Sequence, residues 1–391
     1  MPETRRIVTA APENSETPLE KVGSWVTPSR LFFVRNHFEP PTVDPQTWRL
    51  QVGGFVERPR EWTLDELDAL PERTVFATME CAGNGRSFLS PHVHGVQWGA
   101  GAIGHAEWTG IPLRAVLEKS GVKPQTKEIL FEGLDHGREA DHPELLSFAR
   151  SLPLAKALDR ETLLVTKMNG EPLEPIHGFP LRLIVPGWYG VASVKWIGRI
   201  DAIDHAFTGY YQSKKYTIQR RTPQGEAQTV IVGPMPVKSE IVRPTDGETL
   251  GLGTNRIFGV AWAGEEAVAR VEVSTDGGDS WNDAELLGPQ SAYSWTLWEF
   301  LWEVSEPGQH SLLARATSAS GRVQPLEHDP LLGGYHIHFT RPREVLVGAK
   351  SRRQDQFADV DALVWDMNAF AEANVRRPLD VELELYEGAG I

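Results

Sequence analysis

The later part of the chain is built from short segments in which apolar and polar residues alternate, and this pattern limits the fold most. Residues 256–262, 269–274 and 297–304 alternate in this way, as strands do when one face lies against a core. The Asp-Gly-Gly-Asp run at 276–279 is typical of a turn between two strands. Short strands at this spacing predict a β-sandwich over residues 234–342.

Residues 25–233 carry a different mixture, in which apolar strands alternate with helical segments. Thr63 and Glu66 have the spacing of a helix-capping box, and Gly121 is a typical helix stop. This part is therefore predicted to be a mixed α/β domain, which places the whole chain in the α+β class. Strands are predicted over residues 30–38, 48–56, 74–79, 128–135, 180–186 and 194–200, a strand with its turn over 163–170, and helices over 63–70, 111–120 and, with a proline break, 145–158.

The two ends of the chain lack the patterns of these domains. Residues 1–24 are polar, contain prolines and show no periodicity, which predicts a loosely held N-terminal arm. Residues 343–391 are interpreted as a C-terminal tail, in which apolar positions over 359–373 share one face of a predicted helix.

Charge and composition exclude several classes of protein. The net charge is −14, which argues against a general nucleic-acid binder, because such a protein needs a basic face for phosphates. The single cysteine cannot form an internal disulfide, and there is no apolar run long enough to span a membrane. We expect a cytoplasmic protein. A periplasmic location stays open, because Arg5-Arg6 is only a weak export signal.

That single cysteine, Cys81, stands where a strand runs into a glycine-rich loop. Gly83 and Gly85 allow close backbone approach or a positive φ angle, and Arg86 supplies a cation that favours a thiolate. Three interpretations are compatible with this setting. The cysteine packs inertly in the core, acts as a nucleophile with a distant histidine, or offers one soft ligand to a metal.

Cations and histidines supply the other candidate site residues. Several cations lie in strands or at strand ends beside glycine loops, and in an acidic chain this placement indicates an anionic ligand. His92 with His94, and His336 with His338, would each share one face of a strand, although packed or exposed histidines explain them as well as a metal site does. The cations in question are Arg35, Arg86, Arg182, Lys195 and Arg199.

Several of these segments together resemble the sulfite oxidase family of molybdenum enzymes. The Cys loop, Met-Glu-Cys-Ala-Gly-Asn-Gly-Arg-Ser at 79–87, carries the resemblance, together with His-Gly-Phe-Pro at 177–180 and Lys-Trp-Ile-Gly-Arg at 195–199. Residues 33–37, 95–98 and 131–135 fit the family in the same order. Residues 271–278 with Trp281 resemble the immunoglobulin-like dimerisation domain of that family.

The resemblance implies a molybdopterin cofactor, no haem, and Cys81 as the one protein ligand to molybdenum. It also implies a homodimer that oxidises sulfite to sulfate by oxo transfer and passes electrons to a separate acceptor, such as a cytochrome c or oxygen. The implied substrate and catalytic residues are Cys81, Arg35, Arg86, Trp98 and Tyr216. The implied cofactor-binding residues are His37, Asn36, Cys81, Asp135, His177, Arg182, Gly187 and Lys195.

Three positions depart from the pattern of animal family members. Gly85 and Gly333 stand where those enzymes have arginines, and Lys215 stands where the family has an aspartate beside the tyrosine. The anion site is therefore expected to be altered. Reduction of a sulfoxide or of nitrate with the same cofactor is the alternative enzymatic function, and a non-enzymatic β-sandwich binding protein is the alternative outside enzymes.

Overall fold

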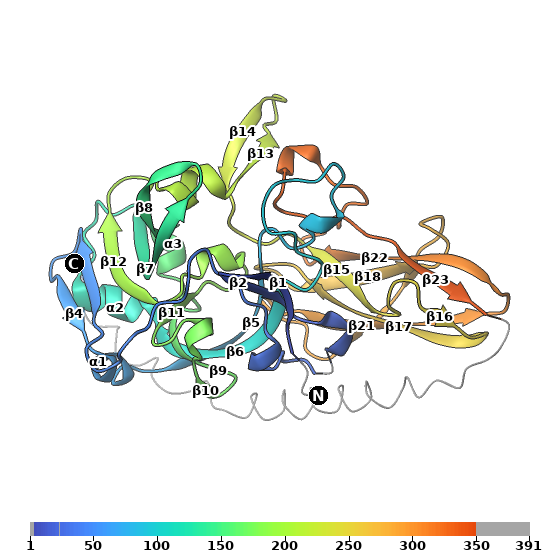
Figure 1. Cartoon of the computed structure of the whole chain (residues 1–391), viewed down its shortest axis with the longest axis horizontal. Helices are drawn as coiled ribbons and strands as arrows, with labels where there is room; N and C mark the ends of the chain where they lie inside the picture. The colour runs from blue at the N-terminus through green and yellow to red at the C-terminus, as the bar shows by residue number, and fades with distance from the viewer. Residues whose placement is uncertain (1–3, 23, 349–391) are drawn as a thin grey trace, which may run out of the picture.

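The computed structural model describes residues 4–22 and 24–348, and it consists mostly of β-strands with few, short helices. Figure 1 shows two parts joined along the long axis of the molecule. Residues up to about 210 form one end, and the strands after residue 237 form the other.

Two five-stranded sheets form the first part. Their strands are β3 (Leu50–Gly54), β4 (Arg60–Trp62), β5 (Arg73–Glu80), β6 (Ile103–Pro112), β7 (Glu128–Glu139), β8 (His142–Pro153), β9 (Leu163–Met168), β10 (Glu171–Pro172), β11 (Arg182–Ile184) and β12 (Ile197–Ile203). One sheet has the order β10-β9-β6-β5, with β11 also paired to β9. The other has the order β4-β3-β12-β7-β8, in which β3 and β12 are parallel.

The helices confirm two sequence predictions and correct a third. Helix α1 (Leu64–Asp68) has the predicted capping box between Thr63 and Glu66, and α2 (Leu113–Ser120) ends at Gly121, whose φ is 71°. The helix predicted over 145–158 is wrong, because most of this stretch is strand β8 and only α3 (Leu154–Ala157) is helical. The ladder with β7 determines the conformation there and overrides the local helical pattern.

The N-terminal segment is not a loose arm. Strands β1 (Arg6–Ala10) and β2 (Glu13–Glu16) form an antiparallel hairpin, and residues 14–17 are buried. The side chains of Asn14, Ser15 and Thr17 are hydrogen-bonded, which allows their burial, whereas Oε1 of Glu16 has no hydrogen-bond partner. The hydroxyl of Thr17, for example, donates to the carbonyl of Ile103 at 2.7 Å.

Two further sheets share one apolar core at the other end of the molecule. Their strands are β15 (Lys238–Arg243), β16 (Thr249–Leu250), β17 (Gly253–Trp262), β18 (Val268–Ser274), β19 (Asn282–Asp283), β20 (Glu285–Leu287), β21 (Thr296–Val304), β22 (Gly308–Ser318) and β23 (Arg343–Val347). We call them the C-terminal sheets. One has the order β15-β17-β21-β20 and the other β16-β23-β22-β18-β19. Inward side chains of both sheets, such as Ile257 and Val271, pack in one cluster.

The edges of this second part differ from the prediction in two places. Strand β23 pairs with β22 and β16, so residues 343–347 belong to the C-terminal sheets rather than to a separate tail. The segment with His336 and His338 is not a strand, and His336 has a φ of 50°. The helix predicted over 359–373 lies outside the described residues.

The two parts are packed against each other through a shared core. Phe258, Trp262 and Trp295 of the C-terminal sheets and their loops lie in the same apolar cluster as Leu183 and Tyr189 of the first part. A hairpin of β13 (Thr217–Arg221) and β14 (Ala227–Ile231) projects between the two parts in Figure 1. Among the described residues, no helix combines the length and the apolar character that a membrane crossing requires.

Candidate active site

Cys81 follows the last residue of β5 and opens a tight turn at the edge of a pocket. Its backbone N–H donates to Ala102 O at 2.8 Å, and its carbonyl accepts from the N–H of Asn84 at 2.9 Å. Gly85 then turns the chain with a φ of 92°, a region that favours glycine. Cys81 is 7% exposed. Burial raises the pKa of its thiol, and Arg35 opposes this shift.

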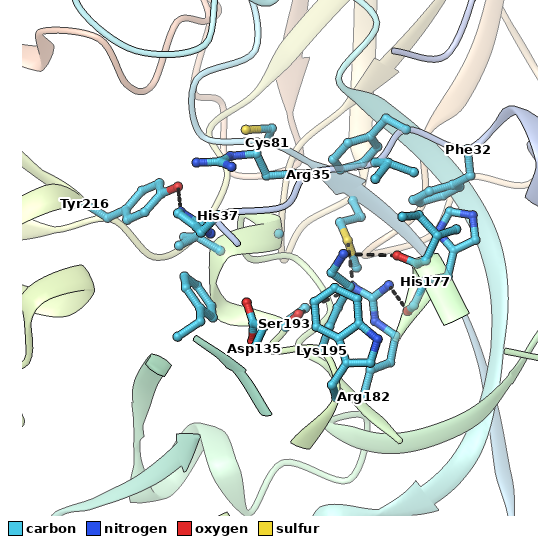
Figure 2. Close-up of a pocket in the computed structure, with 18 residues that line it drawn as sticks. Phe32, Arg35, His37, Cys81, Asp135, His177, Arg182, Ser193, Lys195 and Tyr216 are labelled. Atoms are coloured by element: carbon cyan, nitrogen blue, oxygen red, sulfur yellow. Dashed lines mark hydrogen bonds between the residues drawn. The ribbon is translucent and has the colours of Figure 1, made fainter. Parts of the chain in front are cut away.

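The pocket behind Cys81, which we call the inner pocket, holds three cations. Arg35, Arg182 and Lys195 are among its lining residues. In Figure 2, Cys81 and Arg35 lie at one end of the pocket, and Lys195 and Arg182 lie at the other. None of the three cations forms an ion pair with a carboxylate of residues 4–22 or 24–348.

Two of these cations are held by neutral groups alone. Arg182 donates to the His177 carbonyl at 2.8 Å and to the Met79 sulfur at 3.5 Å, while its Nε has no partner. Lys195 donates to the Ile176 carbonyl at 3.0 Å and to the amide oxygen of Asn36. Burial lowers the pKa of Arg182 to about 9, and burial together with Arg182 lowers the pKa of Lys195 well below its ordinary value.

Among the described residues, Asp135 is the one carboxylate that lines the inner pocket. Its Oδ1 is buried without a hydrogen-bond partner. Burial raises its pKa to about 6, although Lys195 opposes this shift. The inner pocket therefore carries an excess of positive charge in a desolvated setting. Such charge is costly unless an anion compensates it.

His37 and Tyr216 form a pair beside Arg35. The His37 Nε2 and the Tyr216 hydroxyl are 2.8 Å apart, and the imidazole stacks on Phe148 with ring centroids 4.5 Å apart. Burial, with Arg35 next in effect, lowers the pKa of His37 well below its ordinary value, so the imidazole is neutral. Burial raises the pKa of Tyr216, which therefore keeps its proton.

His177 is the second histidine of the inner pocket. Its Nε2 lies 3.0 Å from the Ser29 carbonyl, which fixes the ring. Burial, with Arg182 next in effect, lowers its pKa to about 3. His177 is therefore neutral and presents a hydrogen-bonding ring rather than a charge.

A second cavity adjoins the first at Cys81, and we call it the outer cavity. Arg35, His37, Cys81 and Tyr216 line both spaces. The residues that line only the outer cavity include Gly83, Arg86, His94, Trp98, Glu139, Tyr211, Lys215 and Tyr335. The outer cavity is therefore aromatic and mainly cationic, and Cys81 lines both spaces.

Arg86 is largely held by backbone carbonyls within this outer cavity. Its Nε and Nη2 donate to Gly334 O at 3.2 and 2.9 Å, and its Nη1 donates to Val96 O at 2.7 Å. Its guanidinium also lies 5.3 Å from the centroid of the Tyr335 ring. The loop that contains Gly333 and Gly334 thus supplies an acceptor to Arg86.

The structure brings together most of the sequence-predicted residues. Cys81, Arg35, His37, Asp135, His177, Arg182, Lys195 and Tyr216 line the inner pocket, and Arg86 and Trp98 line the outer cavity. Asn36 supports the inner pocket through Lys195.

The remaining candidates lie away from the two spaces or form no cluster. Gly187 packs against Gly264 and Glu265, facing the C-terminal sheets rather than either cavity. Arg199 pairs with Asp201. In the described part of the chain, no group of histidines, cysteine and carboxylates has the arrangement of a metal site.

Several site residues had no recognisable signal in the sequence. Asn14 of the N-terminal hairpin accepts hydrogen bonds at its Oδ1 from the Asn36 N–H, at 2.9 Å, and from Arg35 Nη1, at 3.2 Å. Glu139 and Tyr335 enter the outer cavity from distant segments. The five-residue π-helix Tyr211–Lys215 directly before Tyr216 is a local feature that often marks functional sites, but it cannot be read from residue spacing.

Comparisons with known proteins identify two domains in the chain. The oxidoreductase molybdopterin binding domain matches residues 37–211, and the Mo-co oxidoreductase dimerisation domain matches residues 229–334.

Sulfite oxidases from other organisms match most of the chain. Mitochondrial sulfite oxidase of Rattus norvegicus is 37% identical over 340 residues, covering 82% of this chain and 61% of that protein. Sulfite oxidase of Arabidopsis thaliana is 32% identical, covering 80% of this chain and 86% of that protein. This chain therefore spans about three fifths of the length of the rat relative.

A solved structure shows the same fold. The sulfane dehydrogenase SoxCD from Paracoccus pantotrophus superimposes with a TM-score of 0.76 and 30% identity, covering 87% of each chain. The thiol, the buried cations and the fold agree with these matches, and the chain belongs to the sulfite oxidase family of molybdopterin-dependent oxidoreductases.

Proposed function

We propose that this protein is a molybdenum-dependent oxidoreductase that oxidises sulfite to sulfate and passes the electrons to a separate acceptor. The observation that carries the proposal is the inner pocket, in which one cysteine thiol lies beside the buried Arg182 and the half-buried Arg35 and Lys195, and none of these cations pairs with a carboxylate of the described residues. A soft sulfur ligand next to an anion site fits a molybdenum cofactor with a phosphate group.

The residues of the inner pocket fit such a cofactor. Arg182 Nε and Asp135 Oδ1 are buried without partners, and a bound organic group with polar edges would satisfy them. Arg182 and Lys195, with the ring of His177, would hold the phosphate and the pterin, and the Cys81 sulfur would ligate the metal. When bound, the cofactor supplies the redox chemistry and the oxygen-transfer chemistry.

The outer cavity supplies the residues that would hold the substrate. Arg35 lines both spaces, as Cys81 does, so it would bind the oxyanion. The Tyr216 hydroxyl, oriented by the neutral His37, offers a hydrogen bond at the same place. Trp98 and Tyr335 form walls that exclude water around the anion.

Two candidate substrates, sulfite and a less charged sulfur compound, are distinguished by the cations of the outer cavity. Arg86 already donates three hydrogen bonds to carbonyls, so the outer cavity offers fewer free cationic donors than its composition suggests. A sulfur compound with less charge than sulfite, such as the sulfane named for the Paracoccus structure, is the second candidate for this reason.

The organisation of the protein follows from the same assignment. We propose an α+β protein with a cofactor domain over residues 25–233 and an immunoglobulin-like domain over the C-terminal sheets, through which two copies associate. The match to the dimerisation domain supports the association. The absence of haem, the identity of the acceptor and the cytoplasmic location stay predictions.

The test is a metal analysis followed by turnover with several electron acceptors. Protein from a molybdenum-replete host should contain molybdenum and oxidise sulfite with ferricyanide, cytochrome c or oxygen. Faster turnover of a sulfane sulfur compound would favour the second candidate. Turnover only with reduced dye and nitrate or a sulfoxide would favour the reductase alternative. Protein without molybdenum would contradict the proposal and favour a binding protein.

Cys81→Ser tests the role of the thiol. The hydroxyl is nearly the same size but is a poor ligand for a soft metal, so turnover should fall at least about a thousandfold while the circular dichroism spectrum stays unchanged. Because the native Cys81 side chain is buried and small, the fold should tolerate the change. Retained turnover would exclude Cys81 as the metal ligand.

A further inference from the structure

A buried carboxylate stands directly before Cys81, and its partners come from the C-terminal sheets. Glu80 is 1% exposed. Its Oε1 accepts from Lys238 Nζ at 3.1 Å, and its Oε2 accepts from Trp262 Nε1 at 3.1 Å. Lys238 begins β15 and Trp262 ends β17, and the two residues are directly paired between these strands.

The same carboxylate also holds the turn that Cys81 opens. Oε1 of Glu80 accepts from the Asn84 side-chain amide at 3.0 Å. The Oδ1 of Asn84 accepts from the Ala102 N–H at 3.0 Å, and the Asn84 N–H donates to the Cys81 carbonyl. Glu80 and Asn84 thus hold the turn from both of its ends, and Cys81 lies between them.

Two further contacts attach the same loop to the later part of the chain. Lys238 lies 3.4 Å from Glu240, which in turn pairs with Arg341 at 2.6 Å. The Arg341 guanidinium lies 3.7 Å from the centroid of the Phe88 ring, in the short 3-10 helix Arg86–Phe88 of the Cys81 loop. A chain of alternating charges therefore leads from Glu80 through the C-terminal sheets and back to the loop.

From this arrangement we infer that Lys238 is a positioning residue for Cys81, so that the C-terminal sheets complete the cysteine site. A carboxylate this deeply buried needs a charged partner, and Lys238 supplies that partner from a strand 158 residues away in sequence. The side chain of Glu80 can keep hold of Asn84 only while Lys238 and Trp262 keep it in place. The consequence for turnover rests on the proposed function, whereas the effect on the loop does not.

Hydrogen–deuterium exchange of the full chain, prepared without cofactor, tests the inference directly. Lys238→Met should raise the exchange rate of the amides in residues 81–88 by about tenfold or more, because the loop opens more often. Amides in β12, on the far side of the first part, should keep their rates.

Lys156→Met is the matched control. Lys156 is also a buried lysine, and it also joins the two parts of the molecule, through Glu265 at 2.6 Å. This variant should lower stability and leave exchange in residues 81–88 within about twofold of the wild type. An equal increase in both variants would indicate general loosening of the interface and would overturn the specific role of Lys238.

The loaded enzyme gives an independent readout. Displacement of the metal ligand affects the chemical step more than anion binding, so Lys238→Met should lower kcat by about tenfold with KM for sulfite within about twofold. If Lys238→Met is insoluble, Lys238→Gln, which keeps a donor, should show a smaller rise in loop exchange. Wild-type exchange in residues 81–88 of a folded Lys238 variant would overturn the inference, whether or not the protein oxidises sulfite.

Discussion

At the scale of single residues, Arg182 shows how the inner pocket lowers the folding stability of the protein when no cofactor is bound. The guanidinium is fully enclosed, contacts only neutral groups and has one N–H without a partner. Its pKa falls to about 9 because burial disfavours its charge. Such a group destabilises the cofactor-free fold and is stabilised again when an anion binds. Removal of the Arg182 guanidinium should therefore weaken cofactor binding but not lower the stability of the cofactor-free fold.

Arg182→Met should lower the molybdenum content of the purified protein at least about tenfold, since the anion loses a charged hydrogen-bond donor. The cofactor-free variant should be at least as stable to urea as cofactor-free wild type, because a buried charge has been removed. Arg114→Met, which removes an exposed arginine paired with Glu118, should change neither quantity. A large loss of stability in the cofactor-free Arg182 variant would contradict this account.

At the scale of elements, the N-terminal hairpin is part of the site. Asn14 in β2 binds the Asn36 N–H and Arg35 through one oxygen, while its Nδ2 donates to Thr9 in the same hairpin at 2.7 Å. Asn14→Ala should cost about 1–3 kcal/mol, because a buried N–H loses its acceptor.

The same change should raise KM for sulfite several-fold, since Arg35 loses a partner that orients it. Thr9→Val removes one acceptor of the Asn14 Nδ2, which also donates to the Pro12 carbonyl at 3.1 Å, and keeps the Asn14 oxygen. It should leave KM unchanged, which separates the two ends of the Asn14 side chain. An unchanged KM in Asn14→Ala, measured on loaded enzyme, would remove the hairpin from the site.

The hairpin also shows which secondary-structure elements can be predicted from the sequence. The capping box of α1 and the alternating strands β17 and β21 were predictable, because short-range spacing specifies them. Strand β8 and the hairpin were not, because a ladder with β7 and buried hydrogen bonds to distant backbone determine their conformation. For the same reason the motif around Cys81 indicated the cofactor, whereas Asn14 and Lys238 could not be found by spacing.

At the scale of the whole molecule, the two parts meet around a fully buried histidine. His105 in β6 is 0% exposed. Its ring stacks on Trp295, with centroids 5.6 Å apart, and packs at a tilt against Trp25, with centroids 4.7 Å apart. These tryptophans exchange hydrogen bonds between their indole N–H groups and backbone carbonyls. Burial lowers the pKa of His105 to about 3.

Three other histidines also have a lowered pKa. Burial lowers the pKa of His177 and His336 to about 3 and that of His338 to about 4. In the unfolded chain each binds a proton near pH 6.5, whereas in the folded protein it stays neutral to much lower pH. Their contribution to stability is thus complete above about pH 6.5 and is lost as the pH falls toward about 4.

The expected outcome is a steep loss of stability in mild acid. Each such histidine lowers the free energy of unfolding by about 1.4 kcal/mol per pH unit below about pH 6.

His105→Phe keeps an aromatic ring between the tryptophans but cannot bind a proton. Even if the phenyl ring packs less well and lowers the overall stability, the slope of the unfolding free energy against pH should decrease by about 1.4 kcal/mol per pH unit. Replacing the exposed His92 in the same way should leave the slope unchanged. Urea unfolding followed by tryptophan fluorescence between about pH 7 and about pH 5 measures this slope, and an unaltered slope in His105→Phe would show that the imidazole is protonated within the folded core.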